Sequence, residues 1–83
     1  MNKETKGKVL KIMELGLEVN SKKKNTVFIE YFGHCYGINT RIYYNGWNKE
    51  NTKDFEECVY LDLPEAETKL DKIIKKLEEL KGE

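Results

Sequence analysis

No stretch of the 83-residue sequence approaches the ~20 consecutive apolar residues that a membrane-spanning helix requires. The lysine-rich N-terminus likewise lacks the apolar segment that a secretory signal peptide contains. We therefore expect a cytoplasmic protein. In that compartment the two cysteines, Cys35 and Cys58, should stay reduced rather than form a disulfide.

An excess of positive charge is also missing, because 15 Lys and Arg balance 15 Asp and Glu. Proteins that coat nucleic acids normally carry a strong positive excess, so the neutral balance disfavours that class. Arg41 is the only arginine, and asparagine, isoleucine and tyrosine are abundant. This bias is typical of an AT-rich coding sequence and, with the small size, suits an accessory protein of a phage or another mobile element.

Patterns for catalysis and for metal or cofactor binding are absent as well. His34, Cys35 and Cys58 carry groups that bind zinc, but the first two are adjacent, C-x₂-C spacing is missing and a fourth ligand is lacking. Adjacency also keeps His34 and Cys35 out of a nucleophile–base geometry. No glycine-rich phosphate-binding loop occurs. We expect a protein that is not an enzyme and that uses no metal or cofactor.

What the sequence does contain is enough apolar and aromatic residues for one domain spanning the whole chain. Apolar residues at helical spacing predict a first helix over 4–15, with Gly16 as its stop. Residues 17–19 alternate in polarity and also fit a short extra strand. A last helix is predicted over 65–80, after Pro64. Its apolar stripe consists of Ala66, Leu70, Ile73, Ile74, Leu77 and Leu80.

Three runs rich in β-branched and aromatic residues predict strands over 26–32, 36–44 and 57–63. Gly33 and His34, between the first two runs, are typical of a two-residue type II′ hairpin turn. That turn would pair Phe32 with Cys35, Tyr31 with Tyr36, Ile29 with Ile38 and Val27 with Thr40. Because side chains alternate along a strand, one face then collects a nearly all-apolar set: Val27, Ile29, Tyr31, Tyr36, Ile38, Ile42 and Tyr44.

These elements predict an α+β fold, an αβββα two-layer sandwich in which a three-stranded antiparallel meander carries both helices on one face. The order of elements resembles that of the double-stranded-RNA-binding domain, whose last helix begins with a basic cluster. Pro64, Glu65 and Glu67 occupy that place in this sequence, so no residue of that family is carried over.

With both helices on one face, the second face of the sheet has no helix to cover it. Aromatic residues around one arginine point to this face and predict a partner-binding surface: Phe28, Phe32, Arg41, Tyr43, Trp47 and Tyr60. Exposed apolar patches usually mark partner sites, and aromatic residues and arginine are enriched in protein interfaces. We therefore predict a small non-enzymatic module that docks an unidentified protein partner.

Three alternatives remain open at this point. Rings on an open sheet also suit a single-stranded nucleic-acid-binding protein, with the lysines of 22–24 near the phosphates, although Glu30 and Asp62 oppose this. The second alternative is that the N-terminal segment or a second subunit covers the same face. The third is a homodimer that forms through that face or through the C-terminal helix, whose apolar positions fit a heptad pattern.

Overall fold

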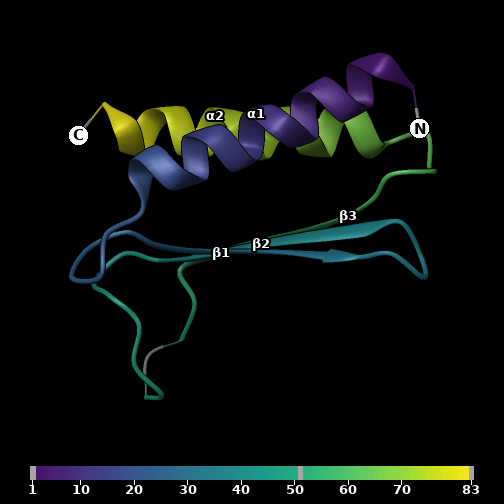
Figure 1. The fold of residues 1–83 in the computed structure, drawn as a ribbon. Helices are drawn as coiled ribbons and strands as arrows, with labels where there is room; N and C mark the ends of the chain where they lie inside the picture. Colours follow the sequence, from purple (N-terminus) through teal and green to yellow (C-terminus); the bar gives the residue numbers. More distant parts are fainter. Residues whose placement is uncertain (1, 51, 83) are drawn as a thin grey trace.

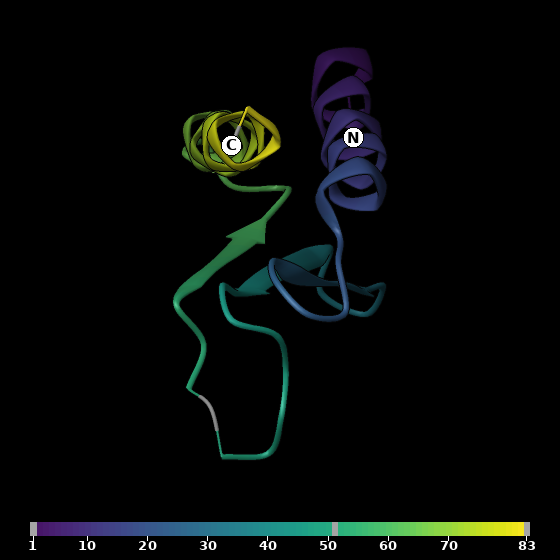
Figure 2. The same ribbon diagram turned by 90° about the vertical axis from the view of Figure 1, so that its left-hand side faces the viewer.

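The computed structural model describes residues 2–50 and 52–82 and confirms an α+β fold. The elements follow in the order α1 (Lys3–Val19), β1 (Thr26–Phe32), β2 (Gly37–Tyr43), β3 (Phe55–Tyr60) and α2 (Ala66–Lys81). The strands form one antiparallel sheet with the order β1-β2-β3. Both helices lie side by side over one face of this sheet, and the loop between β2 and β3 extends on the other side (Figures 1 and 2). Within the described residues, neither helix is long and apolar enough to cross a membrane.

The first helix is longer than its sequence pattern indicates. Asn2 caps it, because the Asn2 side-chain oxygen accepts a hydrogen bond of 2.8 Å from the Thr5 N–H. The prediction that Gly16 stops the helix is wrong, and residues 17–19 form its last turn rather than an extra strand. A Cβ atom on Gly16 would lie 2.7 Å from Ile29 Cδ1, so the missing side chain lets α1 approach β1 closely. This packing outweighs the ~1 kcal/mol by which glycine disfavours a helix interior.

The hairpin between β1 and β2 differs from the predicted two-residue turn. Residues 33–36 form the connection, and the positive φ lies at Tyr36 (+53°) rather than at Gly33. The pairs are therefore Phe32 with Gly37, Tyr31 with Ile38, Ile29 with Thr40 and Val27 with Ile42. The four predicted pairs are wrong by two residues, and Tyr36, expected on the core face, is 53% exposed in the connection.

A shift of two residues leaves the paired side chains of β1 and β2 on their predicted faces, because side chains alternate with a period of two. Tyr31, expected among the core-face residues, is nevertheless 56% exposed near the end of β1. Gly37 fits the observed register for a local reason. A Cβ atom there would lie 3.3 Å from Cys35 Sγ and 3.6 Å from the Tyr60 ring, so glycine makes room for both side chains. Turn chemistry alone does not distinguish registers that keep the same faces.

The remaining boundaries match the prediction to different degrees. The bounds of β1 are as predicted, α2 is displaced by one residue, and β2 lacks one residue at each predicted end. β3 begins and ends earlier than the predicted 57–63. The chain turns after Tyr60, where the Leu63 N–H donates to the Tyr60 carbonyl at 3.1 Å. Leu63, the last residue of the predicted strand, therefore lies outside β3 and is 44% exposed.

The core lies between the helices and the sheet. Its buried apolar residues are Ile12, Leu15, Ile38, Ile42, Val59, Leu61, Ala66, Leu70, Ile73 and Leu77. The two helices are also joined at their surface, where Lys8 Nζ of α1 lies 2.9 Å from Asp71 Oδ1 of α2. Because the apolar stripe of α2 is buried in its own core, that stripe does not offer a free heptad seam to a second subunit.

Ile38 lies at the centre of this core with 2% of its surface exposed. We expect Ile38→Ala to lower the free energy of unfolding by about 2–4 kcal/mol, because the substitution leaves a cavity between the sheet and the helices. Urea denaturation followed by circular dichroism measures this change. A cost near zero would show that Ile38 does not face the core.

Thr40, on the same face of β2, should respond in the opposite direction. It is fully buried, and its Oγ1 has no hydrogen-bond partner within the described part of the chain. Thr40→Val replaces that hydroxyl with a methyl group of similar shape, so we expect the free energy of unfolding to rise by about 1 kcal/mol. The same urea titration tests this, and a loss of stability would mean that the hydroxyl has a partner in solution.

Candidate interaction surface on the open sheet face

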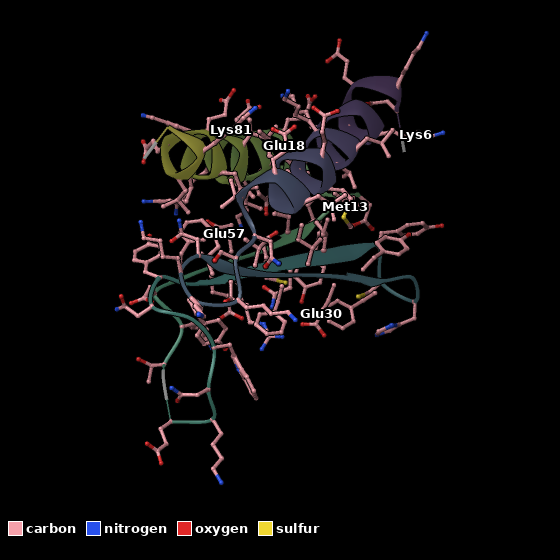
Figure 3. The ribbon with its side chains drawn as sticks, turned by 60° about the vertical axis from the view of Figure 1, so that its left-hand side comes forward. Lys6, Met13, Glu18, Glu30, Glu57 and Lys81 are labelled. Carbon is pink, nitrogen blue, oxygen red and sulfur yellow. The ribbon has the colours of Figure 1, made fainter. Side chains whose placement is uncertain are left out.

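The sheet face opposite the helices, called the open face from this point, is set by strand alternation. Its side chains belong to Phe28, Glu30, Phe32, Asn39, Arg41, Tyr43, Glu56, Cys58 and Tyr60. Figure 3 shows Glu30 on this side of the sheet and Met13 on the helix side. The six residues predicted to bind a partner thus lie on the open face or, for Trp47, in the loop beside it.

Three aromatic rings meet at one end of the open face. The centroids of Phe28 and Tyr43 are 5.5 Å apart with an interplanar angle of 80°, and those of Phe28 and Trp47 are 6.3 Å apart at 67°. Both are edge-to-face arrangements, the geometry that aromatic pairs prefer. Trp47 belongs to the loop after β2 and is 54% exposed. Phe28 therefore links the sheet to an exposed indole ring.

Arg41 joins this aromatic group and is held on two sides. Its guanidinium carbon lies 4.9 Å from the centroid of the Phe28 ring, and its Nη2 lies 3.0 Å from Glu30 Oε1. The first contact is a cation–π interaction and the second an ion pair between neighbouring strands. Together they fix the guanidinium plane, so Arg41 is a positioned side chain and not a freely moving one. We call Phe28, Arg41, Tyr43 and Trp47 the Phe28 cluster.

Tyr43 does not have the exposure that the sequence pattern predicts. Only 6% of its surface is accessible, because Phe28 and the loop after β2 surround it. The expectation that the Tyr43 ring is exposed is therefore wrong, and its direct contact with a partner stays a prediction. Its place in the Phe28 cluster is that of a support beneath the Phe28 side chain.

A second aromatic group occupies the other end of the open face. Phe32 is 37% exposed and Tyr60 is 46% exposed, on either side of Gly37. Polar residues separate this group from the Phe28 cluster, since Asn39 Nδ2 donates a hydrogen bond of 3.0 Å to Glu56 Oε2. The predicted site residues thus form two groups on one face and not a single patch.

Glu56 adds a fixed negative charge between the two groups. The hydrogen bond from the Asn39 amide lowers the pKa of the Glu56 carboxyl, and Lys53 Nζ, 3.0 Å from Glu56 Oε1, lowers it further. Glu56 is therefore ionised at neutral pH. With Glu30, which the sequence already places on this face, it gives the open face two carboxylates.

A hollow of about 470 Å³ lies elsewhere, near the C-terminal ends of both helices. Its lining includes Tyr44 and five charged residues: Glu18, Lys24, Lys76, Glu79 and Lys81. Glu18 forms an ion pair with Lys81, and Lys76 Nζ lies 3.7 Å from Glu79 Oε2. Four of the five charges are therefore paired, which leaves the charge of Lys24 as the net charge of the lining.

Sequence reasoning also missed a set of apolar side chains on the outer surface of α1. Leu10 is 60% exposed, Met13 44% and Leu17 74%. They lie three and seven positions apart, on a helical stripe separate from the buried residues Ile12 and Leu15. The sequence contains a signal for this set, since Leu10, Met13 and Leu17 are spaced at three and four positions.

The residues considered for metal binding lie apart from the Phe28 cluster. His34 and Cys35 are in the connection between β1 and β2, whereas Cys58 is exposed on β3. Across residues 2–50 and 52–82, no group of three or more His, Cys, Asp or Glu side chains is arranged to hold a metal ion. Comparisons with models of protein families, with curated proteins and with solved structures found no match to this chain.

The pKa of Glu56 tests the geometry of the open face. A carboxyl whose pKa is lowered in the folded state adds stability above its unfolded pKa, and this stability is lost as the pH falls through the folded value. Asn39→Ala should therefore raise the pKa of Glu56 and reduce this part of the acid dependence of unfolding. NMR titration of the Glu56 carboxyl carbon measures the pKa, with Lys72→Ala, whose partner is Glu57, as the control. An unchanged pKa in Asn39→Ala would contradict the hydrogen bond.

Proposed function

We propose that this protein is a small non-enzymatic interaction module that docks a protein partner through its open face. The observation that carries the proposal is a sheet face that no helix covers within the described residues, on which exposed aromatic rings surround a positioned arginine. Aromatic residues and arginine account for much of the binding energy in protein interfaces. The size and the composition further suit a cytoplasmic accessory protein of a phage or another mobile element.

The arrangement of the Phe28 cluster supports docking by a preformed surface. Trp47 is exposed, but Phe28 contacts its ring from one side and Tyr43 supports Phe28 from below. A side chain that is already held in place loses less conformational entropy when a partner binds. Trp47 is therefore the best candidate for an anchor that enters a pocket on the partner.

Single-stranded nucleic acid is the alternative partner, and one observation favours it. The Gly46 N–H donates a hydrogen bond of 2.7 Å to the Lys24 carbonyl, so the lysine-containing loop before β1 lies beside the loop that carries Trp47. Stacking rings next to lysines are typical of such binders. Against it, Glu30 and Glu56 place negative charge on the same face, and Arg41 and Lys53 are already paired with them. We therefore favour a protein partner.

Affinity capture from a lysate of the native host tests the choice of partner. We expect wild-type protein to retain a host protein with or without nuclease treatment, and Trp47→Ala to retain much less of it. Lys49→Ala, in the same loop and exposed, is the matched control and should behave as wild type. Capture that disappears after nuclease treatment, or tight binding of a labelled oligothymidylate, would overturn the protein-partner proposal.

Two aromatic variants separate support from anchoring. Trp47→Ala should change the free energy of unfolding by less than about 1 kcal/mol, because the ring is largely exposed, and should weaken binding by about 2 kcal/mol or more. Tyr43→Ala should instead lower the free energy of unfolding by about 3 kcal/mol, because it removes a buried ring. Calorimetry of binding and urea denaturation measure both quantities. Equal stability losses in the two variants would contradict this division of roles.

A further inference from the structure

β1 is an edge strand with backbone groups that point away from the sheet. The Val27 N–H donates to Asn20 Oδ1 at 2.9 Å, on the side away from β2. Ile42 is the residue opposite Val27 on β2, and its carbonyl accepts from the Asp54 N–H on the β3 side. The backbone groups of this pair therefore point away from each other. Backbone direction alternates along a strand, so Ile29 and Tyr31 also direct their N–H and C=O groups outward. Asn20 pairs only with the first of these outward groups, the Val27 N–H.

An apolar groove runs beside this edge. It has a volume of about 280 Å³, and its lining residues are Met13, Gly16, Leu17, Asn20, Val27 and Ile29. One wall is the exposed stripe of α1, and the other is β1 itself. Gly16 opens the groove, because it places no side chain between the helix and Ile29. Apolar side chains and unpaired backbone groups therefore lie next to each other.

We propose that β1 accepts an extended segment of a partner protein as a fourth strand of the sheet. An added strand satisfies the outward backbone groups of Ile29 and Tyr31 through hydrogen bonds. Every second side chain of that strand then enters the groove and contacts Met13 and Leu17. The partner segment is thus one with apolar residues at alternate positions and no proline at the paired positions.

Charge at one end of the groove defines the segment further. Asn20 lines that end, and Lys22 and Lys23 lie in the loop that follows it. Both lysines are exposed, and neither forms an ion pair with another described residue. A strand that runs along the groove toward Asn20 approaches these lysines, and an acidic residue at that end of the segment complements them.

A second copy of the chain does not fit the same edge. Gly16 packs on Val27 and Ile29, so α1 lies above β1, as Figure 2 also shows. Paired strands are about 4.8 Å apart, and two β1 strands related by a twofold axis would bring their α1 helices to a similar separation. Packed helices need about 8–10 Å. A single strand without its own covering helix avoids this clash.

Selection from a displayed library of random peptides of about nine residues tests the proposal, with the folded full chain as bait. Peptides that bind wild type are counter-selected on Leu17→Glu, which places a charge at the groove wall. We expect the enriched peptides to carry alternating apolar residues with Asp or Glu at one end. Failure to enrich any peptide for wild type over Leu17→Glu, or enrichment of a helical spacing of apolar residues, overturns the proposal.

Backbone pairing is tested on the best selected peptide by methylating one amide nitrogen at a time. Binding should fall by about tenfold or more at every second position, the effect of one lost hydrogen bond, and change little at the positions between. A uniform response along the peptide overturns strand addition. Lys22→Glu and Lys23→Glu should each weaken binding, and unchanged binding in both variants overturns the assigned charge pattern.

Two controls separate this surface from the open face and from self-association. Trp47→Ala should bind the selected peptide as wild type does, because this inference is independent of the function proposed for the open face. Leu10→Glu is a second charged variant of the exposed stripe of α1. We expect its melting temperature to match that of wild type, which would show that a charge on this surface leaves the fold intact. Light scattering should show a monomer, and a dimer that Leu17→Glu dissociates would assign the edge to a second copy and overturn the proposal.

Discussion

Both helices of this protein lie on one side of its sheet, and the rest of the structure depends on that constraint. α2 buries its apolar stripe against β3 and α1, and α1 packs on β1 through Gly16. Among the described residues, no further helix or strand covers the second sheet face. The open face must therefore satisfy its own side chains by contacts within the sheet and with one loop.

The contacts on the open face follow from this requirement. A bare arginine or a bare aromatic ring at the sheet surface would be mobile, but Arg41 is held between Phe28 and Glu30. Asn39 and Glu56 form the equivalent polar pair on the neighbouring strands. Cross-strand pairs of this kind each contribute only a fraction of a kcal/mol to about 1 kcal/mol, yet they order the surface. The result is a face that is exposed and already organised.

The close approach at Gly16 has a second consequence, at the edge of the sheet. Because α1 lies above β1, its outer apolar residues stand over the free edge and not over solvent alone. Edge strands are commonly protected by charges, proline or bulges. In β1 the only charged side chain is Glu30, which lies on the open face. The groove side of the edge carries no such protection, and this distinguishes it from an ordinary blunted edge.

Alternation along the strands and helical spacing determined from the sequence alone the α+β class, the order of elements and the face of most strand residues, with Tyr36 and Leu63 as exceptions that lie in turns. These properties are local, because the pleat and the helical turn are intrinsic to the backbone. The hairpin register, the burial of Tyr43 and the continuation of α1 through Gly16 were decided only by tertiary structure. A register shift of two residues preserves the faces, so no local pattern detects it. The burial of a side chain and the need for glycine in a helix depend on which residues of another segment lie nearby. Phe28 contacts Tyr43, and Ile29 lies where a side chain on Gly16 would be.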